Sequence, residues 1–488
     1  MRLLVSSSEA READRQAELL WDYPSERLME EAGIRLQLRI ESLVGRGFKV
    51  YLIGTGNNGG DGLVMARHAY LQGDRNLAVV LVEAPRSPLA LTQLKLVERL
   101  GFPLLEWSDP KTKILLERAD VWIDAVWGTG LKRALEGPSA GRLKELESLR
   151  RSSNATVVAV DVPSGLWSGY QPEQPVLVAS RTLAVQWLKD FCLNPESRDL
   201  CGELESLSVS FPEPAQSRSA LLEPGDERTL IPPFARRAHK GTRGHVLILG
   251  GCEGMSGAVN LAAQSAAAMG AGLVTLGVDE SLVSSLAAQL PAFQVRTSFQ
   301  AWERRDAYDA VVVGPGWGRT PDRASLLLPW WESHLPLVID ADALQAWRGG
   351  QPRSAPTVFT PHPGEFRSLL QKDSFALSDA EAWARTQSAV LVLKNAVTWI
   401  FSPHGDRRAW DGSNPALGTG GSGDCLAGMI GALLASGSEP WTAACAGVAV
   451  HGLSGKDAAD SKGWFTAEKL IEAVALRAYA CRTERHPI

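Results

Sequence analysis

Two glycine-rich segments, far apart in the chain, combine backbone amides with carboxylates in a pattern that could carry out chemistry. The first covers residues 54–62 (GTGNNGGDG) and the second covers residues 414–424 (NPALGTGGSGD). Glycine-rich turns that lead into a helix expose amides that bind anions. A carboxylate beside such amides can move a proton during a reaction. Each segment is therefore a candidate active-site loop.

The first segment allows more than one interpretation. Gly54, Gly56 and Gly59 match the G-x-G-x-x-G pattern of dinucleotide-binding folds, and Glu83 follows the next apolar run, where a ribose ligand would be sought. A nicotinamide dehydrogenase and a simple tight turn are both alternatives at this point. Asp61 argues against the dehydrogenase, because a carboxylate inside the loop would repel a docked pyrophosphate. The two asparagines of the loop are better suited to a cation or a polar ring.

Two more loops of the first half place carboxylates at the ends of apolar runs. Asp124 precedes a glycine turn in residues 123–131 (IDAVWGTGL), and Asp161 and Ser164 lie in residues 160–165 (VDVPSG). Because ligands of open α/β sheets bind outside the carboxyl ends of the strands, we expect these loops to meet in one crevice. Asn58, Asp124 and Ser164 would supply only hard oxygen ligands, which suit an alkali or alkaline-earth cation rather than zinc.

In combination, these motifs resemble those of the NAD(P)H-hydrate epimerase domain over roughly residues 1–215. The resemblance implies a potassium ion at Asn58, Asp124 and Ser164. Our hypothesis is that Asp161 is the acid/base that assists epimerisation at the hydrated carbon of the nicotinamide ring; the alternative is that it only caps the following turn. The implied substrate contacts are Asn57, Asn58, Gly59, Gly60, Asp61, Gly128, Thr129, Gly130, Leu131, Lys132, Arg133, Ala134 and Asp161.

Two positions depart from that family's pattern. Glu31 stands where the family usually has asparagine, and Lys189 is followed by Asp190 rather than by a small residue. The role of Lys189 is left open by the sequence.

The second glycine-rich segment is not a Walker A loop, because no Gly-Lys-Ser/Thr follows the glycines. The amides of residues 420–423, at the start of the apolar helical stretch 425–435, predict an anion hole for a phosphate. Asp424 can accept a proton from a hydroxyl that attacks this phosphate. A helix start capped by an aspartate is the alternative.

Other polar residues of the second half fit the same site. Asp340 and Asp342 end one apolar run, His362 and Glu365 follow another, and Lys394 ends a third. Together they describe a site for a nucleotide and Mg²⁺.

These motifs resemble the ribokinase-like superfamily, and within it the ADP-dependent NAD(P)H-hydrate dehydratases, from about residue 239 to near the C-terminus. The implied contacts with the hydrated cofactor are Ala258, Gly316, His362 and Asp424. The implied nucleotide contacts are Lys394, Asn395, Ala396, Val397, Thr398, Gly420, Gly421, Ser422 and Gly423. Asn395 replaces a frequent glycine, and Met255 lies near a usual tyrosine. The implied reaction phosphorylates the ring hydroxyl of the S hydrate, with ADP or ATP as donor, and then eliminates phosphate.

The elements that must position these loops can be read from the apolar runs. With 488 residues the chain exceeds the size of one hydrophobic core. Short apolar runs separated by helix-length stretches predict parallel sheets covered on both faces. They lie at residues 48–53, 77–82, 120–126, 156–160, 246–249, 273–278, 310–313, 337–339, 357–359 and 390–393.

We therefore expect an α/β protein with two three-layer αβα domains. Residues 1–215 would form a Rossmann-like domain and residues 225–488 a ribokinase-like domain. Proline, serine, glycine and charged residues place the boundary between about 212 and 228.

Composition narrows the class of partner. Fifty basic against fifty-five acidic residues give a net charge of -5, which disfavours nucleic acid. No apolar stretch approaches the roughly 18 residues of a membrane span, and the N-terminal apolar run is too short for a signal peptide. We expect a cytoplasmic homo-oligomer without nucleic-acid or membrane partners. The substrates that the resemblance implies are small molecules, the hydrates of NADH and NADPH (NADHX and NADPHX). A vitamin or sugar kinase with an accessory domain and a non-enzymatic ligand-sensing or scaffold module are the alternatives.

Overall fold

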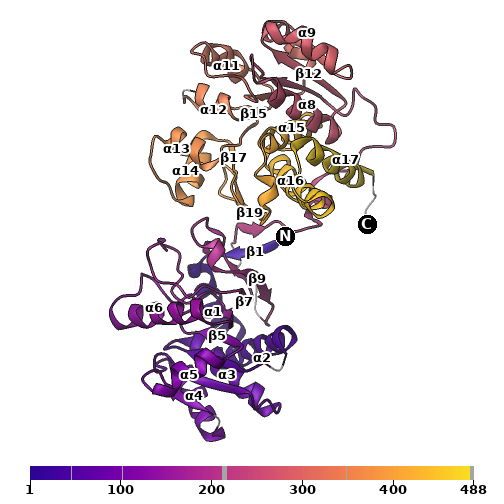
Figure 1. Cartoon of the computed structure of the whole chain (residues 1–488). Coiled ribbons are helices and arrows are strands. Elements are labelled where there is room, and N and C mark those ends of the chain that lie inside the picture. The colour runs from indigo at the N-terminus through magenta and orange to yellow at the C-terminus, as the bar shows by residue number, and fades with distance from the viewer. Residues whose placement is uncertain (46, 102, 211–216, 348, 484–488) are drawn as a thin grey trace. The chain divides into compact units, whose positions relative to one another are not determined.

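The computed structural model describes residues 1–45, 47–101, 103–210, 217–347 and 349–483 (Figure 1). The chain divides into two compact units, one of residues 3–219 and one of residues 1–2 with 220–488. We call them the N-terminal and the C-terminal unit. The first part of the predicted boundary, residues 212–216, lies outside the described residues, as do the ends of the predicted domains at 215 and 488.

The N-terminal unit is built on a parallel sheet of seven strands in the order β4-β3-β2-β5-β6-β7-β9. The strands are β2 (Lys49–Ile53), β3 (Leu77–Leu81), β4 (Leu104–Glu106), β5 (Val121–Ala125), β6 (Thr156–Val160), β7 (Arg181–Val185) and β9 (Glu203–Leu207). A separate short pair joins β1 (Arg2–Val5) in parallel to β8 (Leu188–Lys189), with Val5 opposite Lys189.

Helices cover both faces of this sheet, because successive strand residues point to opposite sides. Tyr51 and Ile53 of β2 pack with α2 (Ser25–Val44) and α3 (Asn57–Leu71), whereas Val50 and Leu52 pack with α5 (Pro110–Arg118) and α6 (Gly137–Ser152). The remaining helices are α1 (Ser7–Trp21) and α4 (Pro88–Leu100). This is the predicted three-layer arrangement.

The C-terminal unit has a larger sheet in which the strand order runs β13-β12-β11-β14-β15-β16-β17-β18-β19. All neighbours are parallel up to β17, and the last two pairings are antiparallel. The strands are β11 (His245–Leu249), β12 (Leu273–Val278), β13 (Gln294–Thr297), β14 (Ala310–Val313), β15 (Leu337–Ile339), β16 (Thr357–Phe359), β17 (Val390–Leu393), β18 (Val397–Phe401) and β19 (Arg407–Asp411). The short β10 (Ser219–Leu221) lies at the division between the units.

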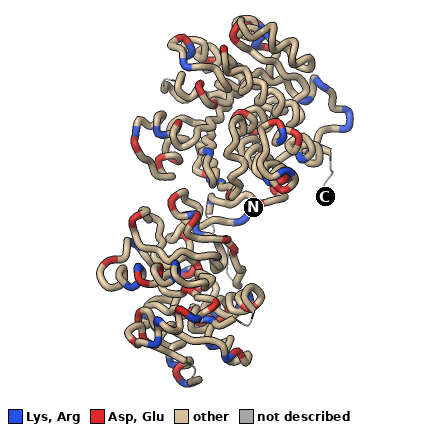
Figure 2. The backbone as a smooth tube through the Cα atoms, in the orientation of Figure 1, with Lys and Arg blue, Asp and Glu red and all other residues tan. Residues whose placement is uncertain are grey.

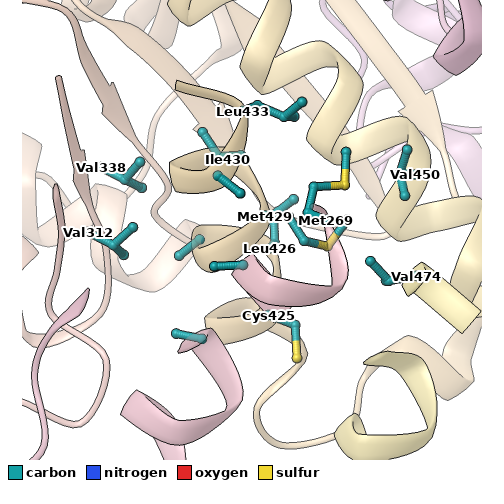
Figure 3. Packing of buried hydrophobic residues seen from close by; sticks show 14 of the residues in the cluster. Met269, Val312, Val338, Cys425, Leu426, Met429, Ile430, Leu433, Val450 and Val474 are labelled. Atoms are coloured by element: carbon teal, nitrogen blue, oxygen red, sulfur yellow. The ribbon is translucent and has the colours of Figure 1, made fainter. Parts of the chain in front are cut away.

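Four helices bury one face of this sheet. They are α8 (Ser256–Ala268), α15 (Ser422–Ala435), α16 (Pro440–Lys462) and α17 (Ala467–Thr483). Figure 3 shows Leu426, Met429 and Ile430 of α15 among the side chains of the sheet and of the other helices. Every residue of α15 from 425 to 435 is buried, so the glycine-rich segment before it is fixed to the centre of the core.

The opposite face of the C-terminal sheet carries an aromatic cluster. Phe359 of β16 lies edge-to-face against Trp383, with ring centroids 4.9 Å apart, and against Trp347 at 5.3 Å. The remaining helices of the unit are α7 (Asp226–Leu230), α9 (Glu280–Gln289), α10 (Ser298–Glu303), α11 (Arg323–Glu332), α12 (Asp342–Ala346), α13 (Pro363–Leu370) and α14 (Leu377–Gln387). The predicted α/β class is confirmed in both units.

Acidic and basic residues are interspersed over both units (Figure 2). In the part of the chain that the structure describes, we find no helix with the length and apolar character needed to cross a bilayer.

Candidate active sites

The N-terminal unit contains a cavity of about 520 Å³ at the carboxyl ends of its strands. Residues of α1, of α2 and of the loops after β2, β5, β6 and β7 form its walls. Of the predicted site residues, it is lined by Asn57, Asn58, Asp61, Gly128, Thr129, Gly130, Leu131 and Asp161. The structure therefore brings the three predicted loops together. Lys132, Arg133 and Ala134, which follow Leu131 in the loop after β5, do not line the cavity.

The first glycine-rich segment is less of a loop than its composition predicts, because α3 already begins at Asn57. Close packing explains its glycines. A Cβ at Gly59 would overlap the carbonyl oxygen of Gly54, so the helix can approach the end of β2 only without a side chain there. A Cβ at Gly128 would lie 3.0 Å from Cγ of Asn58. Asn57 and Asn58 thus lie in the first turn of a helix, where the amides have no helical acceptor.

Asp161 ends β6 in a left-handed backbone conformation, with φ of 68°. Its carboxylate Oδ1 accepts hydrogen bonds from the Lys189 ammonium and, at 3.2 Å, from the Val185 amide. Lys189 is only 3% exposed, and its Nζ also donates to the carbonyl oxygens of Trp187 (3.1 Å) and Val185 (3.3 Å). Uncommon backbone conformations of non-glycine residues cluster at functional sites. Lys189, whose role was open from the sequence, holds Asp161 in one orientation.

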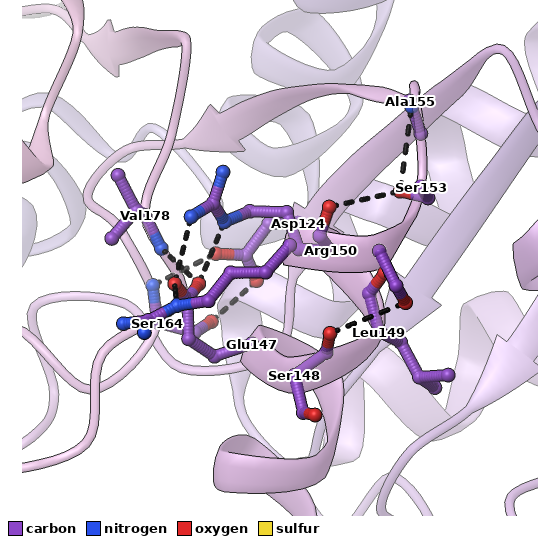
Figure 4. A network of polar contacts seen from close by, with 11 residues as sticks. Asp124, Glu147, Ser148, Leu149, Arg150, Ser153, Ala155, Ser164 and Val178 are labelled. Atoms are coloured by element: carbon purple, nitrogen blue, oxygen red, sulfur yellow. Dashed lines mark hydrogen bonds and ion pairs between the residues drawn. The ribbon is translucent and has the colours of Figure 1, made fainter.

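Asp124 and Ser164 lie beneath the cavity, and both are fully buried. The Ser164 amide donates to Oδ2 of Asp124 at 2.8 Å and its hydroxyl donates to Oδ1 at 2.5 Å (Figure 4). Ser164 Oγ in turn accepts from the Trp127 amide at 2.9 Å. Burial raises the pKa of Asp124 to about 6, although its hydrogen bonds from Ser164 and Val126 act in the opposite direction.

Two further carboxylates open into this cavity. Asp61 comes from α3, as predicted, and Asp14 comes from α1, which sequence reasoning did not single out. Burial, reinforced by the charges of Asp161 and Asp14, raises the pKa of Asp61 well above its usual range. Burial and the charge of Asp161 raise the pKa of Asp14 to about 6. The available sequence signal was the spacing of Ala10 and Asp14 along one face of a capped helix.

Glu31, which departs from the family pattern, and Glu83 both lie outside the cavity lining. Glu31 accepts from the Arg35 side chain at 2.8 Å and from the Ser210 amide at 3.2 Å, so it ties α2 to the segment after β9. Glu83, the residue expected to bind ribose in a dehydrogenase, accepts a hydrogen bond from Ser139 and pairs with Arg142 at 3.7 Å. Neither carboxylate lines the cavity.

In the C-terminal unit, Asp424 lies in the first turn of α15, which begins at Ser422 after Gly421 with φ of 90°. Burial raises the pKa of Asp424 to about 7, and the negative charges of Asp340, Asp342 and Glu365 add to this effect, whereas Lys394 opposes it. The amides of the same turn have no acceptor in a preceding turn. The first turn of α15 thus combines amides without a helical acceptor with a carboxyl group whose pKa is raised.

Lys394 lies next to this turn. Its Nζ is 2.6 Å from Oδ1 of Asp340, which ends β15 and is only 1% exposed. A Cβ at Gly423 would lie 3.3 Å from the same Nζ. The Lys394 ammonium therefore lies beside the first turn of α15.

The predicted cofactor contacts Ala258 and Gly316 lie together. A Cβ at Gly316 would be 3.1 Å from the Cβ of Ala258 and 3.2 Å from the Cβ of Met255. Met255, which stands near the family's tyrosine, is 41% exposed. Two residues beyond Gly316, the amide of Gly318 donates to Asp342 at 2.9 Å, which links this group to the carboxylates that act on Asp424.

His362 forms the N-cap of α13. Its Nδ1 accepts from the Gly364 and Glu365 amides at 3.0 and 3.3 Å, and its Nε2 lies 3.5 Å from Glu365. The ring is 57% exposed, so it is available to a ligand. Asn395 to Thr398 form the turn after Lys394 and the start of β18; Asn395 Oδ1 accepts from the Ala396 amide at 2.9 Å. His451 of α16, missed from sequence, bonds through Nε2 to the Ser422 carbonyl at 2.9 Å.

Comparison with known proteins places both units in characterised families. Residues 246–476 match the family described as NAD(P)H-hydrate dehydratase, and residues 25–191 match the family described as YjeF-related protein N-terminus. The C-terminal unit is also similar to the crystal structure of a ribokinase-like superfamily protein from Enterococcus faecalis, with a TM-score of 0.50 and 24% identity, over 55% of this chain and 98% of that one. This likeness confirms the predicted ribokinase-like fold.

Relatives of full length share both halves. The bifunctional NAD(P)H-hydrate repair enzyme Nnr of Gloeobacter violaceus is 36% identical over 465 residues, which cover 89% of each chain. The enzyme of the same name from Moorella thermoacetica is 33% identical over 94% of this chain and 93% of its own. The chain belongs to the family of bifunctional NAD(P)H-hydrate repair enzymes.

Proposed function

We propose that this chain repairs nicotinamide cofactors whose reduced ring has been hydrated, with one activity in each unit. The N-terminal unit interconverts the R and S hydrates, and the C-terminal unit converts the S hydrate back to NAD(P)H. The observation that carries the proposal is that each unit pairs a glycine-rich helix start with a carboxylate of the predicted catalytic type, Asp161 in one and Asp424 in the other. A dehydratase that accepts one epimer needs an epimerase to recover the other.

In the epimerase, Asp161 would transfer a proton at the hydrated carbon of the ring. Its orientation by Lys189 and the Val185 amide supports this role, because a proton-transfer group must lie within hydrogen-bond reach of the atom it serves. The lining residues Asn57, Asn58, Asp61 and Gly128 to Leu131 would bind the substrate. Gly59 and Gly60, outside the lining, would contribute through the backbone, and Lys132, Arg133 and Ala134 would meet more distant parts of the substrate.

A potassium ion would be held by Asn58, Asp124 and Ser164. The donor set fits, because carboxylate, hydroxyl and amide oxygens are hard ligands. The Asn58 amide nitrogen is buried without a hydrogen-bond partner in the described structure, and rotation of the amide by half a turn would present its oxygen instead. The ion would supply a fixed positive charge beside the cavity, which is lined by the carboxyl groups of Asp14, Asp61 and Asp161.

In the dehydratase, the hydroxyl of the S hydrate attacks the terminal phosphate of ADP or ATP, and its proton passes to Asp424. The bond between that phosphorus and the bridging oxygen breaks, and AMP or ADP leaves. The phosphorylated hydrate then loses phosphate: the C–O bond breaks, a proton leaves the neighbouring ring carbon, and the double bond of NAD(P)H forms. Lys394 and the amides of Gly423 and Asp424 would stabilise the phosphate, which is the main part of catalysis in phosphoryl transfer.

Mg²⁺ would accompany the nucleotide, since Mg²⁺ prefers phosphate and carboxylate oxygens. Asp340 and Glu365 provide such oxygens close enough to Asp424 to act on its proton affinity. Ala258, Gly316 and His362 would contact the hydrated cofactor, and residues 395–398 and 420–422 would contact the nucleotide. A homo-oligomer in the cytoplasm is the state that we predict for the enzyme.

The test is to incubate the purified chain with mixed R and S hydrates, Mg²⁺, K⁺ and either ADP or ATP, and to follow the near-ultraviolet absorbance of reduced nicotinamide. Complete recovery requires both activities, whereas recovery of only the S fraction would mean that the epimerase is inactive. No recovery with either nucleotide, or accumulation of a stable phosphorylated product as expected for a kinase, would reject the dehydratase.

A further inference from the structure

Helix α1 presents a polar face to the epimerase cavity. Ala10, Arg11 and Asp14 line the cavity, and Ala13 and Ala17, which lie three residues after Ala10 and Asp14 in the helix, are buried. Ala13 packs with Val5 of β1 and with Trp187, the residue before β8. The position of Asp14 is thus fixed by the same β1–β8 pair that carries Lys189.

Asp161 cannot by itself serve both faces of a bound ring. To interconvert the epimers, a hydroxyl must leave one face of the hydrated carbon and return to the other. The Asp161 carboxylate is held by Lys189 and by the Val185 amide, and its backbone is in the left-handed region, so its orientation is fixed. Among the described residues no hydrogen bond holds the Asp14 carboxyl, and it reaches the cavity from a different element.

We propose that Asp14 is a second catalytic residue of the epimerase, which transfers a proton on the ring face that Asp161 does not reach. This inference rests on the proposed epimerase activity of the unit. In one direction, the Asp14 carboxyl gives its proton to the departing hydroxyl, the C–O bond breaks, water forms, and the ring nitrogen lone pair makes a C=N⁺ bond.

Water then returns to the opposite face. Its oxygen forms the new C–O bond, the C=N⁺ bond reverts to a single bond, and the Asp161 carboxylate takes the proton that the water loses. Cavity water returns this proton to Asp14. In the reverse direction the two carboxyls exchange roles, so that the pair must hold one proton between them and no other reactant is consumed.

The surroundings of Asp14 suit this sharing. The charged groups that face it are Arg11 on its own helix, Asp61 of α3, Asp161 at the end of β6 and Lys189 of β8. Arg11 is directed to the Thr129 carbonyl, which its Nη1 reaches at 3.4 Å. Burial and the charge of Asp161, opposed by Lys189, raise the pKa of Asp14 to about 6, so a proton is available near neutral pH.

The experiment compares wild type, Asp14→Asn, Asp14→Glu and Glu12→Gln as full-length proteins. Glu12 is on the same helix but outside the cavity, where it pairs with Arg15. R-to-S interconversion is measured from about pH 5 to 9, on both sides of the Asp14 pKa of about 6, and the uncatalysed rate is subtracted at each pH. Thermal unfolding of each variant reports on folding of the N-terminal unit, and dehydration of the pure S hydrate reports on folding of the C-terminal unit.

We expect Asp14→Asn to lower epimerisation at least ~100-fold and Glu12→Gln to leave it unchanged. Wild-type epimerisation should decline as the pH rises above about 6, because the pair of carboxyl groups then loses its shared proton. Asp14→Glu should have most of the wild-type rate and the same decline with pH. In Asp14→Asn the decline should disappear. Unimpaired epimerisation by Asp14→Asn, or a slower rate with an unchanged pH profile, would overturn the assignment. Absence of epimerisation in wild type would instead reject the proposed function of the unit.

Discussion

Both units join a lysine to an aspartate at a strand end, but they use the pair differently. In the N-terminal unit Lys189 binds Asp161, the proposed catalytic carboxylate itself, and the lysine is almost inaccessible. In the C-terminal unit Lys394 binds Asp340, and among the residues that the structure describes the proposed base, Asp424, forms no ion pair. The first arrangement fixes a proton-transfer group, and the second holds a cation for phosphate while keeping the proton affinity of the base high.

The largest effects should come from the two carboxylates themselves. Asp161→Ala should abolish R-to-S interconversion and leave dehydration of the S hydrate intact, whereas Asp424→Asn should lower dehydration at least ~100-fold and leave epimerisation intact. Nucleotide binding by Asp424→Asn, measured by calorimetry, should remain nearly normal. Either variant losing both activities would contradict the separation of the two sites.

Removal of the lysines should distinguish the two pairs by stability. Lys189→Met leaves the nearly buried Asp161 without its partner, and breaking a buried ion pair in this way costs about 3–5 kcal/mol of unfolding free energy. In the second pair the Asp340 side chain is only 2% exposed, against 12% for Asp161, so Lys394→Met leaves the more deeply buried carboxylate unpaired and the loss should be larger. Calorimetric unfolding of both variants measures this. Equal losses of unfolding free energy in the two variants would show that burial of the unpaired carboxylate does not determine the size of the effect.

The pH dependence of dehydration should follow Asp424. A base acts in its ionised form, and the pKa of Asp424 is raised to about 7, so the rate should increase as the pH rises through 7 and level off above it. Initial rates with S hydrate at saturating nucleotide give this profile. A rate that is flat between about pH 6 and 8 would exclude Asp424 as the group that titrates.

The smallest effect should come from the packing of Gly128 against Asn58. Gly128→Ala would place its Cβ 3.0 Å from Cγ of Asn58, so this side chain must shift by a few tenths of an ångström. We expect a several-fold higher K⁺ requirement for epimerisation, with dehydration unchanged. Titration of the epimerase rate with K⁺ at constant ionic strength tests this, and Gly130→Ala, where a Cβ meets open space, is the matched control.

The sequence predicted the buried parallel strands well, because they are continuous apolar runs between helices. The runs at 156–160 and 273–278 coincide with β6 and β12, and most others agree within a residue or two. The structure adds elements without such runs. β13 (QVRT) and β9 (ELESL) are edge strands, and these two and β19 (RRAWD) carry charged or polar residues and depend on a neighbouring strand for their conformation.

The sequence predicts a loop over residues 54–62, because glycines are poor helix formers, whereas α3 begins at Asn57. Their role here is close packing of the helix against β2 and β5, which only tertiary structure reveals. Site residues next to glycine motifs could be proposed from the sequence, whereas Lys189 and Asp14 could not be assigned roles, and the pairing of Asp340 with Lys394 was not predicted. Ion pairs between distant parts of the chain leave no local pattern.

Helices α1 and α15, which carry Asp14 and Asp424, differ in how much of each is buried. α1 buries only Ala13 and Ala17, whereas α15 is buried from Cys425 to Ala435. The free energy of local opening rises with the apolar contact that opening disrupts. One wall of the epimerase cavity can therefore loosen without unfolding its unit, while the dehydratase base is fixed to the core. We expect substrate exchange to be fast in the epimerase, whose reaction is reversible. In the dehydratase, the fixed position of Asp424 would preserve the geometry of the site from phosphorylation to elimination.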